Sequence, residues 1–335
     1  MGKKLISENL IDSIKNVCKD NQDIRLTVGL YKKGVEEYHL FGCSGEELPF
    51  EKYTYEIGSI TKTFTSYILG KAVMNGKVSL EDRMDKYIAD LPYGRIYPTL
   101  GRLATHTAGY PADSKEFEER FEKNIDSNEY DLIDYNEMVR IIKEIDSEDK
   151  IYPAVYSNFG IGVLGYCLAQ AYGKSIDYLI EECINEFALH ETFIENNENI
   201  LRCPNILNGY KNGKNLGNLI WGQQSIIGAA GFLCSTAEDM IKYGKAQFES
   251  TNKSLKLCHT KHAEFYRGEG VPLDIGLCWI LIPDWNILWH NGGTRCFTSV
   301  LGIDIKNETV VVVLSNCLIE ELTNIGLNQV RDLME

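Results

Sequence analysis

The feature that most constrains the fold is the placement of strand-like segments at both ends of the 335-residue chain. Residues 25–31 and 35–42, joined by a short turn that contains glycine, predict an N-terminal β-hairpin. Four more strand-like runs follow near the other end, at 275–282, 285–290, 297–304 and 309–316. Because an isolated hairpin is unstable in water, we expect both ends to join one antiparallel sheet.

Helix-like segments fill the rest of the chain. Apolar residues at helical spacing predict amphipathic helices over 10–17 and 319–334, while the middle carries helix-like segments at 133–145, 160–173 and 175–187. These observations predict an α/β (α+β) fold in which helices flank the sheet. The expected organisation is a single domain over 1–335, with a sheet region formed by 1–75 and 245–335 and a mainly helical lobe formed by 76–244.

The charge balance excludes two classes of partner. The formal net charge of −14, from 48 acidic and 34 basic residues, disfavours binding to nucleic acid and to anionic membranes. The N-terminus lacks the run of about 7–15 apolar residues that a signal peptide requires, and no segment reaches the length of a membrane span. The sequence therefore predicts a cytoplasmic location, unless a signal peptide has been removed, and leaves the oligomeric state open.

The cysteines and histidines give little support for a metal site. The ten cysteines form no Cys-x-x-Cys pair, as expected of reduced thiols. Cys258, His259 and His262 form a short cluster, but it lacks the fuller ligand pattern of a zinc site. Neither a metal nor a cofactor is expected.

The first candidate for chemistry is Ser59, which follows Ile-Gly and precedes Lys62 by three residues at the start of a predicted helix. A serine hydroxyl is a weak nucleophile and needs a proton acceptor, which a lysine one turn away can approach. The free N–H groups of a helix start can also stabilise an oxyanion. The alternative is an ordinary N-cap serine beside a solvated lysine, and the same spacing recurs at Ser147 and Ser250.

The second motif is Tyr156-Ser157-Asn158, just before a small and apolar helical segment. It can supply a phenol that relays the proton of the serine, and an amide that holds the substrate. Its other interpretation is an asparagine N-cap beside a buried tyrosine.

The third motif is His290-Asn291-Gly292-Gly293, at the end of a predicted strand. Two glycines allow an extended substrate to approach the strand, and the N–H of Gly293 can serve as a second oxyanion donor. His290 and Arg295 are candidates for reading a substrate carboxylate. Taken alone, two adjacent glycines are more often a bulge or a turn than a binding site.

In combination, these motifs carry a resemblance to a known family. YEIGSITKTF (55–64) resembles the Ser-x-x-Lys motif of the serine β-lactamase and penicillin-binding protein superfamily, and the other two motifs follow in that family's order. The Tyr-x-Asn form is similar to the class C branch, which contains class C β-lactamases, DD-peptidases, D-aminopeptidases and esterases. LATHTAGYP (103–111) and GAAGFLCSTAEDMIKY (228–243) extend the resemblance, which covers residues 8 to 330.

The resemblance implies a β-lactamase/transpeptidase-like fold for a single catalytic domain, and it implies roles for the motif residues. Ser59 would be the acylated nucleophile, Lys62 its proton partner, and Tyr156 the general base that later protonates the leaving group. The substrate-binding residues would be Asn158, His290, Asn291, Gly292, Gly293 and Arg295.

Departures from the family pattern bear on the substrate. His290 and Asn291 stand where β-lactamases usually carry lysine and threonine, and Cys296 stands where the family usually has glycine. We therefore expect a serine hydrolase whose partner is a small molecule or short peptide. A D-amino-acid peptidase, carboxypeptidase or esterase is favoured over a true β-lactamase.

Other functions remain as alternatives. The main one is a penicillin- or peptide-binding module that is acylated without efficient turnover. A glutaminase would share the Ser-x-x-Lys logic but would not be expected to carry the flanking segments. A Ser-His triad through His106 would need a nucleophile elbow, and the sequence contains no Gly-x-Ser-x-Gly.

Overall fold

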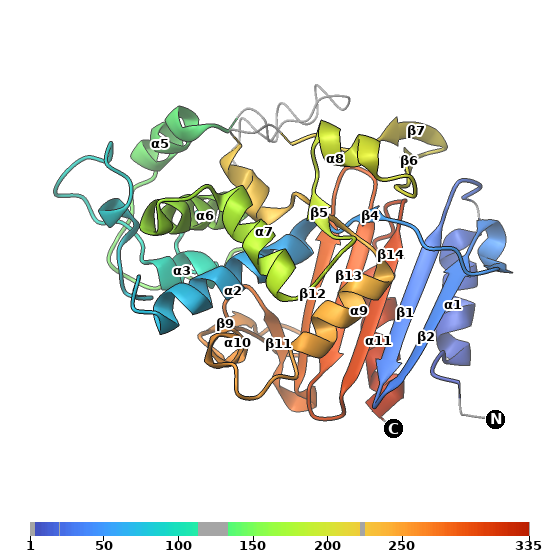
Figure 1. The fold of residues 1–335 in the computed structure, drawn as a ribbon. Coiled ribbons are helices and arrows are strands. Elements are labelled where there is room, and N and C mark those ends of the chain that lie inside the picture. Colours follow the sequence, from blue (N-terminus) through green and yellow to red (C-terminus); the bar gives the residue numbers. More distant parts are fainter. Residues whose placement is uncertain (1–3, 20, 113–132, 222–224, 335) are drawn as a thin grey trace.

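The computed structural model describes residues 4–19, 21–112, 133–221 and 225–334 (Figure 1). Its centre is a nine-stranded antiparallel sheet in the order β3-β2-β1-β14-β13-β12-β11-β10-β9. The strands are β1 (Leu26–Lys32), β2 (Val35–Phe41), β3 (Glu47–Leu48), β9 (Ala263–Tyr266), β10 (Leu273–Ile275), β11 (Ile280–Ile282), β12 (Ile287–Gly293), β13 (Thr298–Asp304) and β14 (Thr309–Ser315). The predicted fold class, with a sheet built from both chain ends, is confirmed.

Strands β1 and β14 join the two ends of the chain inside the sheet. They pair in continuous register from Leu26 with Ser315 to Lys32 with Thr309. Strand β14, TVVVVLS, is buried along its whole length. A continuous β-branched run is typical of a strand covered on both faces, which explains why polar residues do not alternate here.

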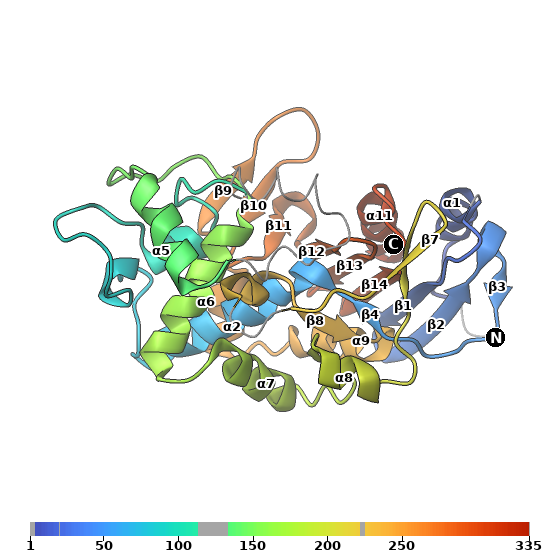
Figure 2. The same cartoon turned by 90° about the horizontal axis from the view of Figure 1, so that it is seen from above.

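Helices cover both faces of this sheet (Figure 2). On one face, α1 (Glu8–Cys18) and α11 (Leu322–Met334) pack together, with α11 against β13 and β14. On the other face, α9 (Ala237–Ala246) packs against β1 and β14. The sheet therefore separates two apolar cores.

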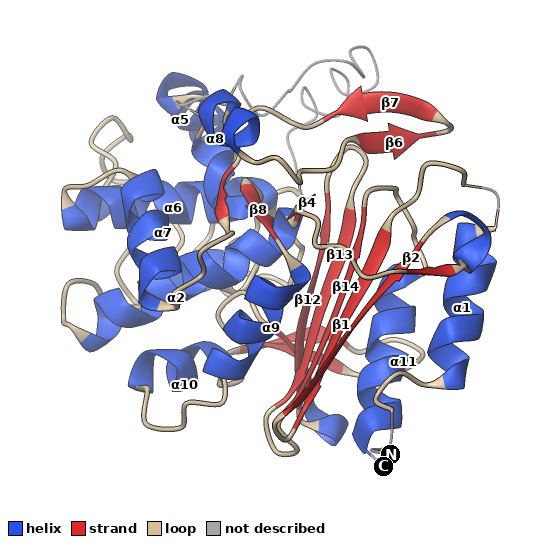
Figure 3. Cartoon of the chain, turned by 45° about the vertical axis from the view of Figure 1, so that its right-hand side comes forward, coloured by secondary structure: helices blue, strands red, loops and turns tan. Residues whose placement is uncertain are grey.

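The helical lobe lies beside the face that carries α9 (Figure 3). Its helices are α3 (Leu100–Ala104), α5 (Tyr135–Glu144), α6 (Asn158–Tyr172), α7 (Ile176–Glu186) and α8 (Asn197–Arg202). Helix α2 (Thr61–Met74) lies before the expected bounds of 76–244 but packs on α6 and α7, and α10 (Lys253–His259) packs on α2. Two small sheets complete the structure: β4 (Tyr55–Glu56), β8 (Leu233–Ser235) and β5 (Phe193–Ile194), and the hairpin of β6 (Gly209–Lys211) and β7 (Lys214–Gly217). None of the helices in the described ranges is long and apolar enough to cross a membrane.

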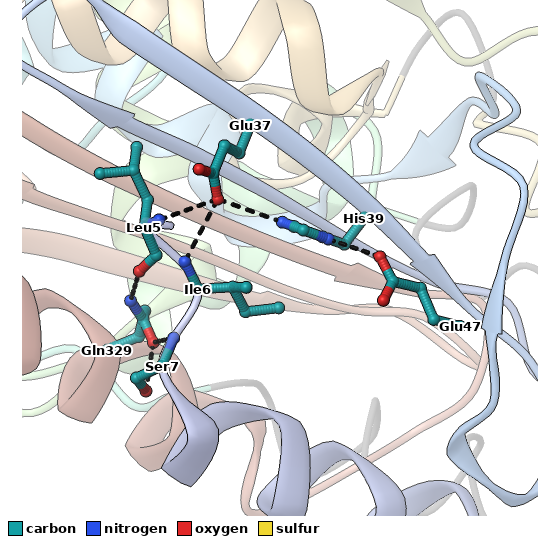
Figure 4. Close-up of polar contacts among 7 residues, drawn as sticks. All are labelled: Leu5, Ile6, Ser7, Glu37, His39, Glu47 and Gln329. Carbon is teal, nitrogen blue, oxygen red and sulfur yellow. Dashed lines mark hydrogen bonds and ion pairs between the residues drawn. The ribbon is translucent and has the colours of Figure 1, made fainter. Parts of the chain in front are cut away.

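Polar contacts tie the N-terminal segment to the sheet and to the last helix (Figure 4). The carboxylate of Glu37 on β2 accepts hydrogen bonds from the N–H groups of Leu5 and Ile6, at 2.9 and 3.3 Å. The buried amide of Gln329 on α11 donates to the Leu5 carbonyl at 2.8 Å and accepts from the Ser7 hydroxyl at 2.7 Å. One amide therefore connects the two ends of the chain.

The C-terminal strands differ from the sequence-based prediction in one place. The expected single strand over 275–282 is wrong, because the chain turns after β10 and returns as β11, with the Gly276 N–H donating to the Trp279 carbonyl at 2.8 Å. A side chain at Gly276 would meet the Cys258 carbonyl oxygen, only 2.1 Å from the Cβ position. Edge strand β9 was not predicted.

Candidate active site

Ser59 lies in a short 3-10 turn, Gly58–Ile60, that leads directly into α2. The N-cap of α2 is Ile60, which makes no side-chain cap bond, so the helix-cap interpretation of Ser59 is wrong. Instead, Ser59 Oγ accepts a hydrogen bond from Lys62 Nζ at 2.7 Å, and the serine is partly exposed. The hydroxyl is therefore positioned for chemistry rather than used as a cap.

Lys62 is fully buried despite its charge. Its Nζ also donates to the Ala230 carbonyl at 2.8 Å and lies 4.8 Å from the centroid of the Tyr156 ring. A buried ammonium needs such partners to offset its lost hydration. The Ser-x-x-Lys copy at Ser147 has a different arrangement, because it lies in a loop where Lys150 pairs with Glu148 at 3.1 Å.

The third motif meets the nucleophile through backbone contact. Gly58 has φ +49°, and a Cβ on it would lie 2.9 Å from the Gly293 carbonyl oxygen. A Cβ on Gly292 would lie 2.0 Å from the Ile57 oxygen, whereas the Cβ position of Gly293 has no atom within 4 Å. The end of β12 therefore lies against the serine and leaves open space at Gly293, where an extended substrate can lie.

The second motif precedes α6 and brings Tyr156 to Lys62. Ser157 is the N-cap, since its hydroxyl oxygen accepts from the Gly160 N–H at 2.9 Å. The proposed asparagine cap is therefore wrong: Asn158 is the first residue of the helix, and its N–H donates to the Ala112 carbonyl at 3.0 Å. Tyr156 is half-buried.

Two histidines flank the Tyr156 ring, His106 with a centroid separation of 4.7 Å and His290 with one of 6.1 Å. Burial, with smaller contributions from Lys62 and His290, holds the pKa of His106 well below its ordinary value. Burial, followed by Lys62, lowers the pKa of His290 to about 3. Both imidazoles are therefore neutral near pH 7 and add no positive charge beside Lys62.

Asn291 and Arg295 do not join this cluster in the way predicted. The Asn291 amide donates to the Thr323 hydroxyl of α11 at 3.0 Å, because alternate residues of β12 face opposite sides of the sheet. The Arg295 guanidinium donates to the Leu216 carbonyl at 2.5 Å. His290 is fully buried. The predicted carboxylate-reading pair of His290 and Arg295 therefore has no support in the geometry.

A pair of buried carboxyl groups, Glu56 and Glu195, lies behind the third motif and was missed in the sequence. Glu56 accepts from the Leu219 N–H at 2.9 Å, and Glu195 accepts from the Trp221 indole at 2.9 Å. Burial, then the neighbouring Glu56, raises the pKa of Glu195 well above its ordinary value. Within the described ranges Glu56 Oε2 and Glu195 Oε1 are buried and make no hydrogen bond of ordinary geometry. A proton shared between the two carboxyls would satisfy both atoms, and Thr294 lies close enough to Glu56 to support that carboxyl.

The short cysteine and histidine cluster is engaged elsewhere. His259 Nε2 contacts Gln247 Oε1 at 3.1 Å, and His262 Nε2 contacts the Leu257 carbonyl at 3.0 Å. The Cys258 thiol donates to the Ser66 carbonyl at 3.3 Å. These three side chains are therefore engaged in contacts within the protein, and the contacts account for them without a metal site.

The chain is similar in sequence and in fold to known proteins. A β-lactamase from Pseudomonas fluorescens is 29% identical over 196 residues, which are 55% of this chain and 50% of that protein. A class C β-lactamase structure aligns over 97% of this chain and 96% of its own, with TM-score 0.78 and 19% identity. A β-lactamase/D-alanine carboxypeptidase from Pseudomonas syringae aligns over 98% of each chain, with TM-score 0.75 and 17% identity.

The similarity to the two solved structures establishes the fold. The chain spans about half the length of the first curated relative. The sequence model of the Beta-lactamase family matches residues 48–331, which include all three motifs. This protein belongs to the Beta-lactamase family.

Proposed function

We propose that the protein is a serine hydrolase that forms an acyl-enzyme on Ser59 and acts on esters, amides or short peptides. The observation that carries the proposal is the hydrogen bond of 2.7 Å between Lys62 Nζ and Ser59 Oγ, with the Tyr156 ring centroid 4.8 Å from the same Nζ. A hydroxyl, an amine and a phenol in this arrangement can activate the nucleophile without any further group.

The reaction would proceed in two balanced halves. Lys62 stabilises Tyr156 in its phenolate form, and Ser59 Oγ gives its proton to this phenolate as it attacks the substrate carbonyl. The N–H groups of Ser59 and Gly293 receive the developing oxyanion. Tyr156 then protonates the leaving group and returns to the phenolate form. In the second half, water gives a proton to Tyr156 as it attacks the acyl carbonyl, and Tyr156 passes this proton to Ser59 Oγ as the acyl group leaves.

The charges around Ser59 support a substrate without a carboxylate next to the scissile bond. In the third motif His290 is buried and neutral, and Arg295, two residues after the motif, donates to the Leu216 carbonyl and lies near Glu195. A charged donor makes the strongest hydrogen bonds to a carboxylate, and neither of these residues offers one toward Ser59. We therefore favour an esterase, amidase or D-amino-acid peptidase over a β-lactamase or a carboxypeptidase.

The test is the intact mass of the protein over time with benzylpenicillin and with p-nitrophenyl acetate. We expect a transient adduct from the ester on wild type and none on Ser59→Ala. Ser147→Ala removes the serine of a second Ser-x-x-Lys copy and should behave as wild type. An adduct that persists would favour the binding module, and an ester adduct that survives Ser59→Ala would overturn the proposal.

A further inference from the structure

His106 has an unusual backbone conformation directly after α3. Its φ is +58°, in the left-handed region that costs a residue with a side chain about 1–2 kcal/mol. Glycine is the usual residue at such a position, just after a helix end. Strain of this kind persists where the surroundings enforce it, so the retained imidazole requires an explanation.

His106 forms hydrogen bonds with Val155 and Ser157, the residues on either side of Tyr156. The Val155 N–H donates to the His106 carbonyl at 2.9 Å, and the Ser157 N–H donates to His106 Nδ1 at 3.1 Å. The ring of His106 also packs on the Tyr156 ring, with centroids 4.7 Å apart. One residue therefore holds the chain on both sides of Tyr156 and covers its ring.

The protonation of His106 follows from the same contacts. Because Nδ1 accepts a hydrogen bond, the neutral ring carries its proton on Nε2. A protonated ring could not accept from Ser157 and would add a second positive charge close to Lys62. In the described ranges His106 Nε2 is buried without a hydrogen-bond partner. A buried polar group without a partner costs free energy, and an apolar side chain could fill the same space without that cost.

We propose that His106 is a positioning residue that fixes Tyr156 above Lys62 through the Ser157 N–H and through ring contact. The inference rests on the proposed function, in which Tyr156 exchanges the proton of Ser59. Loss of the imidazole would let residues 155–157 relax while the Val155 bond to the main chain of residue 106 remains. Misplacement of a reacting group by about 1 Å can cost about 100-fold in rate.

Two variants separate the side chain from the strain. His106→Gly removes the imidazole and relieves the left-handed backbone, and its melting temperature, measured beside the rate, separates a loss of positioning from a loss of stability at the emptied buried site. His106→Asn tolerates this backbone and places an amide oxygen where Nδ1 accepts. We expect ester acylation of His106→Gly to fall about 10- to 100-fold in kcat with little change in KM, and His106→Asn to recover most of that loss.

A matched control removes another buried imidazole. His259 contacts Gln247 and packs edge-on against Trp279, with ring centroids 5.7 Å apart. His259→Asn should leave acylation unchanged. Equal losses in His259→Asn and His106→Gly, or full activity in His106→Gly, would overturn the inference.

Hydrogen exchange provides a readout that does not depend on activity. A peptide that contains the Ser157 amide should exchange faster in His106→Gly than in wild type and should regain protection in His106→Asn. Unchanged protection in His106→Gly would refute the contact itself. If wild type shows no acylation while this exchange pattern holds, the proposed function fails and the positioning contact stands.

Discussion

Gly58 and Gly293 are in backbone contact, since a Cβ on Gly58 would lie 2.9 Å from the Gly293 carbonyl oxygen and 3.0 Å from its nitrogen. The contact brings together the turn that carries the nucleophile and the end of β12. Both obstructing atoms belong to the backbone and cannot rotate away. The separation between Ser59 and the third motif is therefore set by the absence of a side chain at residue 58.

Gly58→Ala should thus move the turn that carries Ser59 away from the end of β12. We expect ester acylation to fall by at least about 100-fold, because the oxyanion donors lose their spacing. The control is Gly173→Ala, which has φ +64° after α6 but no atom within 4 Å of its Cβ position. It shares the backbone strain and should lower the melting temperature while leaving acylation intact. If both variants lost acylation to a similar extent, backbone strain alone would explain the loss, and the spacing between residue 58 and Gly293 would not be its cause.

Lys62→Met tests the buried ammonium. We expect the acylation rate to fall about 10²- to 10⁴-fold, since the proton of Ser59 then lacks its partner. The melting temperature should stay the same or rise, because an apolar side chain of similar length replaces a fully buried charge. Lys150→Met, at an exposed loop position, is the control and should change neither quantity. Normal acylation of Lys62→Met would exclude lysine from the mechanism.

The sequence predicts the parts of this site that depend on short spacing. Ser59 and Lys62 are one helical turn apart, and Tyr156 lies directly before a recognisable apolar helix, so each could be named without coordinates. The orientation of Asn291 was also accessible: on a strand, it faces the side opposite to His290 and Gly292. The order of the three motifs along the chain supported the resemblance to the family, which no single motif could do.

Contacts between distant segments could not be predicted. Glu56 is the last residue of β4 and Glu195 directly follows β5, and these two strands are joined through β8. The role of His106 depends on a positive φ and on main-chain contacts with residues 155–157, and neither leaves a periodic pattern. The division of 275–282 into two strands depends on the approach of Gly276 to the Cys258 carbonyl.

Gln329→Leu should destabilise the protein without affecting catalysis. The substitution keeps an apolar core contact but leaves the Leu5 carbonyl and the Ser7 hydroxyl without their partner. Unpaired buried groups cost about 1–3 kcal/mol, so we expect the free energy of unfolding to fall by that amount in urea titrations. Gln170→Leu, at an exposed position on α6, should show no loss. Equal stabilities for the two variants would contradict the proposed connection between the chain ends.

The Glu56–Glu195 pair should make stability depend on pH in a defined direction. The pKa of Glu195 is raised in the folded state by burial and by Glu56, so the folded protein holds a proton that the unfolded chain releases above about pH 4.3. Stability contributed by that proton is complete below this pH and is lost as pH rises toward the folded pKa, by up to about 1.4 kcal/mol per pH unit.

Glu195→Gln isolates this effect. A glutamine can still accept from the Trp221 indole and donate to Glu56, but it cannot release a proton. The variant should therefore gain stability relative to wild type between pH 5 and pH 8, as measured by urea unfolding at intervals of one pH unit. Subtracting wild type removes the shared contributions of His106 and His290, whose lowered pKa values act mainly below pH 6.5. Parallel curves for the two proteins would show that Glu195 is already ionised in the folded state.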